Sequence, residues 1–170
     1  MSRICLSHRE VLFRIAQDGF RMTTAHDVKQ KAQRGPHIAL ECSLASEVTA
    51  ISPFVDKLML LLRNCGCVPE GVSDVEIALR EALANAILHG NHEDRRKHVH
   101  VTCRCDPDEV SIAVKDEGKG FDTDNVPDPT APQNIGLIHG RGIHVIRALM
   151  DEVRFDEGGA VIHMKKRNVI

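Results

Sequence analysis

The segment from Ser73 to Asn91 constrains the fold most, because it has the pattern of one amphipathic helix with its own start and stop signals. Ser73 followed three residues later by Glu76 is a capping box, in which each side chain satisfies one free amide at a helix start. Gly90 tolerates the left-handed conformation that ends many helices. Apolar residues at helical spacing predict a face packed on a core: Val75, Leu79, Ala82, Leu83 and Ala86.

A second face of this predicted helix is polar. Glu81, Asn85 and His89 follow at i, i+4 and i+8, so their side chains line one side of the helix. A carboxylate one turn before a carboxamide can form a small polar site. The alternative is a solvated face, which is the commoner case for a single amphipathic helix, with His89 bonded to carbonyls at the helix end.

The remaining pattern is typical of an α+β protein. Alternating apolar residues predict strands over 37–44, 98–105, 110–115, 152–155 and 160–166. Two further helices are expected over 46–64, capped by Ser46 and with Val48 on the inner face, and over 140–150. Pro53 predicts either a kink in the first of these or its true start, with Ser52 as cap. Helices on one face of a mixed, mostly antiparallel sheet form a two-layer sandwich.

Length and charge indicate one globular domain and exclude some partners. We expect residues 1–35 to be a basic extension, partly helical and partly a linker, and residues 36–170 to be the domain. A formal net charge of −2 gives no case for nucleic acid or an anionic membrane. With no long apolar run and no signal-peptide pattern, we expect a cytoplasmic protein whose six cysteines are reduced thiols.

Two glycine-containing segments carry further chemistry. The strand over 110–115 leads into Asp116, with Gly118 and Gly120 at a spacing of two. An ionised aspartate accepts a hydrogen bond from an exocyclic amine, as in adenine, and glycine lets a ligand approach the backbone. A turn without a ligand explains a single instance of this motif equally well. Residues 123–139 are rich in proline and predict a long loop.

Gly140-Arg141-Gly142 precedes the last predicted helix. The free amides and the dipole at a helix start favour an anion such as a phosphate chain. A plain helix start is the alternative for this tripeptide. The chain has no Gly-x-x-x-x-Gly-Lys-Ser/Thr phosphate-binding loop.

In this order, the segments resemble the GHKL superfamily of ATP-binding domains, and within it the RsbW-type anti-sigma-factor serine protein kinases. The resemblance covers about residues 37–167. It places the N box at 81–89, the first glycine box at 116–120 and the second at 140–143. It implies the Bergerat ATP-binding fold. The family's last strand often begins with Gly-Thr, whereas this chain has Gly159-Ala160-Val161, and we expect that difference to weaken nucleotide affinity.

The resemblance also implies residue roles. Asn85 would hold a magnesium ion, Glu81 would take a proton from the attacking hydroxyl, and Asp116 would bind the adenine amine. Arg141 would neutralise charge on the leaving phosphate, with a surface arginine as the alternative. Residues 121–139 would be a lid over the triphosphate. The implied nucleotide-binding residues are Asn85, His89, Asp116, Gly118, Gly120, Phe121, Gly140, Arg141, Gly142 and Ile143.

The activity implied is phosphorylation of a serine on an anti-anti-sigma (STAS-type) protein with ATP and Mg²⁺, which regulates a sigma factor by partner switching. A homodimer is expected, because relatives that hold sigma factors commonly dimerise. The alternative is a nucleotide-gated binding module that sequesters a regulator without phosphorylating it. A histidine-kinase core is disfavoured, since no accepting histidine precedes a dimerisation helix pair in so short a chain.

Overall fold

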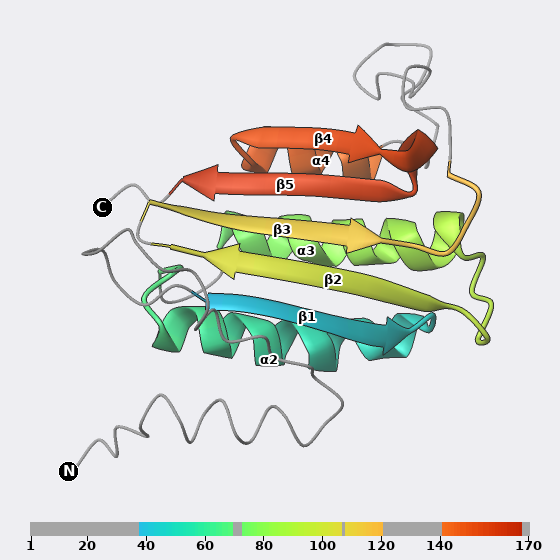
Figure 1. Cartoon of the computed structure of the whole chain (residues 1–170), viewed down its shortest axis with the longest axis horizontal. Coiled ribbons are helices and arrows are strands. Elements are labelled where there is room, and N and C mark those ends of the chain that lie inside the picture. The colour runs from blue at the N-terminus through green and yellow to red at the C-terminus, as the bar shows by residue number, and fades with distance from the viewer. Residues whose placement is uncertain (1–37, 70–72, 107, 121–140, 168–170) are drawn as a thin grey trace, which may run out of the picture.

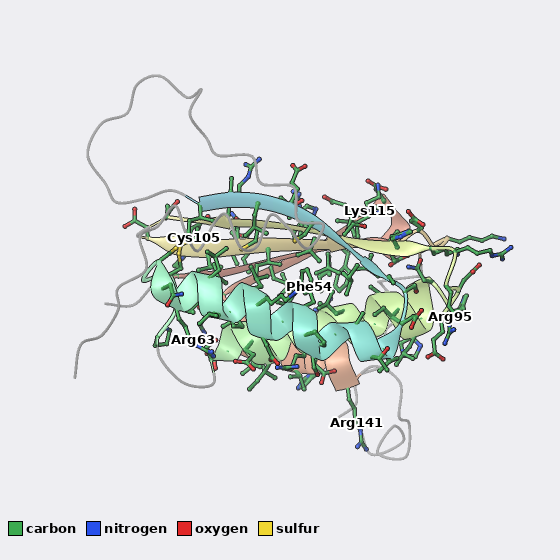
Figure 2. All side chains as sticks on the ribbon, turned by 90° about the horizontal axis from the view of Figure 1, so that it is seen from below. Phe54, Arg63, Arg95, Cys105, Lys115 and Arg141 are labelled. Atoms are coloured by element: carbon green, nitrogen blue, oxygen red, sulfur yellow. A yellow bond between two sulfur atoms is a disulfide. The ribbon has the colours of Figure 1, made fainter. Side chains whose placement is uncertain are left out.

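The computed structural model describes residues 38–69, 73–106, 108–120 and 141–167. Within them, helices cover one face of a single five-stranded sheet (Figure 1). Figure 2, turned by 90°, shows all of these helices on the same side of the sheet. The predicted two-layer α+β sandwich is therefore confirmed. The predicted extension over 1–35 and the predicted lid over 121–139 lie outside the described residues.

The sheet has the strand order β1-β2-β3-β5-β4, and each neighbouring pair is antiparallel. Its strands are β1 (Ile38–Ala45), β2 (His98–Cys105), β3 (Glu109–Lys115), β4 (Glu152–Asp156) and β5 (Val161–Arg167). Alternate side chains of a strand point to opposite faces. The register therefore aligns Cys103, Ile112 and Met164 in one buried row beneath the helices.

Helix α2 (Ile51–Asn64) follows a short 3-10 turn, η1 (Val48–Ala50). Pro53 lies in its first turn, where the missing N–H has no helical partner to lose. The helix begins at Ile51, two residues before the start that was predicted at Pro53 as one of the two alternatives. Its N-cap is Ala50, so Ser46 and Ser52 were wrong as caps. Val48 was also wrongly placed on the inner face and is 45% exposed.

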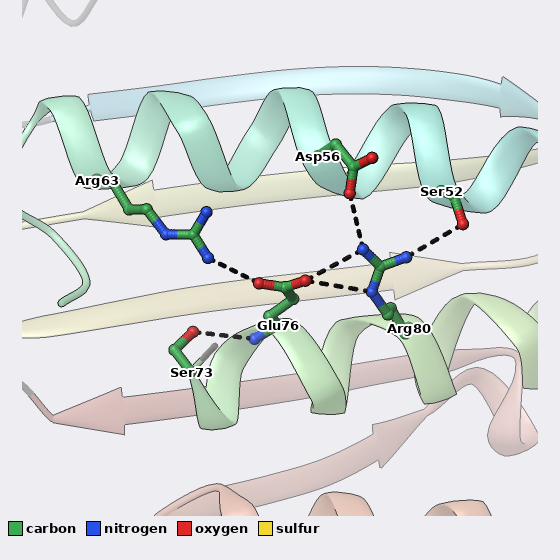
Figure 3. Close-up of polar contacts among 6 residues, drawn as sticks. All are labelled: Ser52, Asp56, Arg63, Ser73, Glu76 and Arg80. Atoms are coloured by element: carbon green, nitrogen blue, oxygen red, sulfur yellow. Dashed lines mark hydrogen bonds and ion pairs between the residues drawn. The ribbon is translucent and has the colours of Figure 1, made fainter. Parts of the chain in front are cut away.

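Helix α3 (Asp74–Asn85) confirms the central prediction in its start and its apolar face. The Glu76 amide donates to Ser73 Oγ over 3.2 Å. The Glu76 carboxylate does not complete the predicted capping box: it binds Arg63 of α2 at 2.7 Å and Arg80 of its own helix at 3.1 Å (Figure 3). Arg80 also reaches Asp56 of α2 at 2.7 Å. Alternating charges thus join α2 to the helix that carries the N box.

The end of this helix differs from the prediction. Residues 86–90 form a π turn, η2 (Ala86–Gly90), which closes when the Asn91 amide donates to the Ala86 carbonyl over 2.8 Å. Left-handed backbone occurs after it, at His92 and Glu93, with φ of 56° and 53°. Gly90 does not have positive φ, so its predicted role as a left-handed helix terminator was wrong.

The remaining helix, α4 (Arg141–Leu149), packs beside α3 and leads into β4. The turn η4 (Glu157–Gly159) joins β4 to β5. Among the described residues, no helix combines the length and the apolar character needed to cross a bilayer.

The cysteines correct another expectation. Cys67 and Cys105 form a disulfide that joins the segment after α2 to the end of β2, with 6.1 Å between their Cα atoms. Cys42 and Cys103 are buried thiols, and burial raises the pKa of each to about 12. The disulfide partners are 38 residues apart, so only the packing of α2 on the sheet brings them together. Local spacing therefore gave no signal for this pair.

Reduction of the disulfide is expected to lower the free energy of unfolding by about 2–4 kcal/mol, because the cross-link restricts the unfolded chain. Urea unfolding with and without dithiothreitol measures the effect. Cys105→Ser should unfold at one midpoint under both conditions, whereas the control Cys65→Ser should keep the difference. Equal midpoints for the wild type would contradict the prediction.

Candidate nucleotide-binding site

Helix α3 presents Glu81 and Asn85 to the start of α4. A Cβ atom built on Gly142 would lie 2.8 Å from Glu81 Oε2 and 3.2 Å from both Asn85 Oδ1 and Asn85 Nδ2. Real Cβ atoms essentially never come within 3.0 Å of another heavy atom, so any other residue at 142 would displace these side chains. The structure thus brings the predicted N box and second glycine box together at one point.

This first cluster combines groups that suit phosphate chemistry. Glu81 supplies a carboxylate and Asn85 a carboxamide, and both side chains are partly accessible. Gly142 lies in the first turn of α4, where backbone amides have no partner within the helix. A proton acceptor, an oxygen ligand for a hard cation and a helix start that favours anions therefore meet here.

A second cluster surrounds Asp116, just beyond the end of β3. Its amide donates to the Ala160 carbonyl over 3.0 Å, and its Oδ1 accepts the Gly118 amide over 2.8 Å. Asp116 is buried, with 7% of the residue exposed. Burial raises the pKa of this carboxyl, and the hydrogen bond from Gly118 opposes the shift.

Glycines pack closely around this carboxylate. A Cβ atom on either Gly90 or Gly118 would lie 2.7 Å from Asp116 Oδ1, and one on Gly118 would also collide with the Gly90 carbonyl. Gly120 has a φ of +73°, and a Cβ there would meet the Gly158 carbonyl. The end of the N-box segment, the first glycine box and the β4–β5 turn therefore meet at contacts that require glycine.

Comparison with known proteins agrees with this geometry. The family of histidine kinase-like ATPase domains matches residues 44–166, which is most of the chain. The chain belongs to this family. Family membership implies ATP binding and agrees with the GHKL-type fold described above.

Several relatives of this histidine kinase-like ATPase chain have names that state a function. It is 28% identical over 130 residues to the anti-sigma F factor of Oceanobacillus iheyensis, covering 74% of this chain and 80% of the relative. It is 29% identical over 107 residues to the serine-protein kinase RsbW of Listeria innocua, covering 58% and 68%. The RsbW of Staphylococcus aureus is 28% identical over 131 residues, covering 70% and 82%. The resemblance to RsbW-type proteins is therefore confirmed at the level of the family.

The other predicted site residues of the histidine kinase-like domain differ in how exposed they are. His89 is exposed and lies in the π turn, whose wider winding ends the i, i+4, i+8 alignment with Glu81. Arg141 is exposed at the first position of α4 and extends away from the sheet (Figure 2). Ile143 is buried. Phe121 and Gly140 lie outside the described residues.

Asn91 and Glu117 were missed by sequence reasoning. Both lie beside residues of the Asp116 cluster and bind the start of β2. The only sequence signal for Asn91 is a polar residue directly after a helix-ending glycine, which is also typical of a solvent-exposed turn. Its burial becomes evident only once β2 and β3 are in place.

Proposed function

We propose that this domain transfers the γ-phosphoryl group of ATP to a serine of an anti-anti-sigma (STAS-type) protein, and that this reaction regulates binding of a sigma factor. The close packing of Gly142 against Glu81 and Asn85 is the observation that carries the proposal. It combines a base, a cation ligand and a phosphate-binding helix start. The name serine-protein kinase of the RsbW relatives supports transfer to a protein serine. The name anti-sigma F factor supports regulation of a sigma factor.

The donor set fits a magnesium ion. Mg²⁺ commonly uses one or two protein oxygen ligands and completes its shell with waters and substrate phosphates. Asn85 Oδ1, which lies beside Gly142 at the start of α4, would be the protein ligand of this ion. When bound, the ion supplies positive charge that stabilises the phosphates during transfer.

The proposed chemistry uses Glu81 as a general base. The serine oxygen forms a bond to the γ-phosphorus while the bond from that phosphorus to the bridging oxygen of ADP breaks. Glu81 accepts the hydroxyl proton, and ADP leaves with the bonding electrons. The amides at the start of α4 hold the phosphate oxygens, and Arg141 neutralises charge that develops on the leaving phosphate.

The second cluster is proposed to select the base. Asp116 accepts a hydrogen bond from the adenine amine, while Gly118 and Gly120 let the ring approach the backbone. His89, Phe121, Gly140 and Ile143 are proposed as further nucleotide contacts, and residues 121–139 as the lid. A homodimer and a cytoplasmic location remain predictions from the sequence.

The test is a transfer assay with γ-labelled ATP, Mg²⁺ and a purified STAS-type protein. Labelled phosphoserine is expected, and a partner whose acceptor serine is replaced by alanine should remain unlabelled. ATP-dependent complex formation without phosphoserine would instead support the nucleotide-gated binding module. No ATP-dependent change in either measurement would contradict both functions.

A further inference from the structure

The turn that carries Asp116 is joined to the end of the N-box segment by a residue that none of the roles above uses. Asn91 is 1% exposed and directly follows the π turn. Its Oδ1 accepts the Glu117 amide over 2.8 Å, and its Nδ2 donates to the His98 carbonyl over 2.9 Å. Its carboxamide therefore links the helix end, the start of β2 and the turn after β3.

The side chain of Glu117 completes a ring of hydrogen bonds with Asn91 and the start of β2. Its Oε2 accepts the His98 amide over 3.0 Å, and its Oε1 lies 2.9 Å from His100 Nε2. The hydrogen bond with His100 lowers the pKa of Glu117, so its carboxylate is ionised at neutral pH. The main chain of Glu117 is thus held by Asn91, while its side chain returns to β2.

These bonds fix Glu117, the residue next to Asp116. The Asp116 carboxylate itself has little room to move. Its carboxylate lies between Gly90 and Gly118, where even an added Cβ atom would be too close. Asn91 is the neighbour of Gly90 and binds the neighbour of Asp116. Its carboxamide therefore sets the separation between the helix end and the carboxylate.

We propose that Asn91 is a positioning residue for base selection: its carboxamide fixes the Asp116 carboxylate where it distinguishes adenine from guanine. This inference rests on the proposed role of Asp116 in nucleotide binding. A buried amide that only stabilised the fold would affect all nucleotides equally. A positioning residue affects the nucleotide whose base Asp116 recognises.

The test compares ATP and GTP as competitors of a fluorescent ADP analogue bound to the full chain. In Asn91→Ala, affinity for ATP is expected to fall about tenfold, as for loss of a buried hydrogen bond, while affinity for GTP stays unchanged. With the STAS-type substrate, KM for ATP should rise by the same factor. The value of kcat should stay constant, because the bonds lost in Asn91→Ala do not involve Glu81 or Asn85.

Two further variants separate positioning from general stability. Ser73→Ala removes the N-cap at the other end of α3, so it should lower the melting temperature and leave the ATP:GTP affinity ratio unchanged. Glu117→Ala alters an exposed side chain of the same ring and should lower the ratio. The double variant Asn91→Ala/Glu117→Ala should lower it by less than the product of the single effects, because both belong to one network.

The outcomes distinguish this inference from the proposed kinase activity. If ATP binding is selective but no phosphoserine forms, the kinase proposal fails and the affinity ratios still decide the role of Asn91. If Asn91→Ala and Glu117→Ala both keep the wild-type ratio, the positioning role is overturned and the kinase proposal stands. If the wild type binds no ATP, both are overturned. Should Asn91→Ala not fold, Asn91→Ser and Glu117→Ala provide the same comparison.

Discussion

Glu81→Gln is expected to bind ATP at least as tightly as the wild type and to transfer phosphate about 10²–10⁴-fold more slowly. The substitution keeps the size of the side chain, so the contact of Glu81 with Gly142 and the packing of α3 on α4 should persist. It removes the carboxylate that accepts the serine proton. Calorimetric titration with Mg-ATP and the rate of phosphoserine formation measure the two effects separately.

Glu152→Gln is the matched control for this prediction. Glu152 is exposed at the start of β4 and pairs with Lys165 over 3.3 Å, away from the Glu81 cluster. The same chemical change there should leave both binding and transfer unaltered. Transfer at the wild-type rate in Glu81→Gln would remove Glu81 from the role of base, whereas loss of ATP binding would indicate a structural role instead.

Features set by neighbouring residues in the chain could be predicted from the sequence. The Ser73 cap, the apolar face of α3 and the five strands depend on local spacing, and all are present. Gly142 was also identified, although for its place at a helix start. Its contact with Glu81 and Asn85 depends on how α4 packs on α3, which spacing alone does not specify.

Features set by distant residues were misread or missed. Gly90 has a terminator's sequence signal, but the structure uses its missing side chain to admit Asp116, which is 26 positions further along. The π turn adds a residue to the end of the helix and thereby directs Asn91 inward. The Cys67–Cys105 disulfide likewise depends on the packing of α2 on β2. In each case tertiary contacts determined the residue's role.

Asp116→Asn is expected to lower ATP affinity by about 10²–10³-fold and to remove the preference for ATP over GTP. The Gly118 amide donates to Oδ1, which favours the amide oxygen of the new Asn at that position. The NH₂ group then takes the position of the other carboxylate oxygen. A donor would face the adenine amine, which is itself a donor, so the contact becomes repulsive. The competition assay with ATP and GTP measures both changes.

Reduced stability of Asp116→Asn would not explain weaker ATP binding, because burial raises the pKa of Asp116 in the folded protein. A raised pKa means that the folded state holds this proton more tightly than the unfolded chain does. The associated stability is present at low pH and is lost as pH rises through the raised pKa. Above the raised pKa the ionised carboxylate therefore disfavours the fold, so at pH values above it Asp116→Asn should unfold at the same temperature as the wild type or higher.

Asp108→Asn is the control for the substitution itself, since Asp108 is exposed in the β2–β3 hairpin at the opposite end of the sheet. It should keep both the affinity for ATP and the preference over GTP. If Asp116→Asn is folded and binds ATP as tightly as the wild type, the adenine is not recognised at this carboxylate.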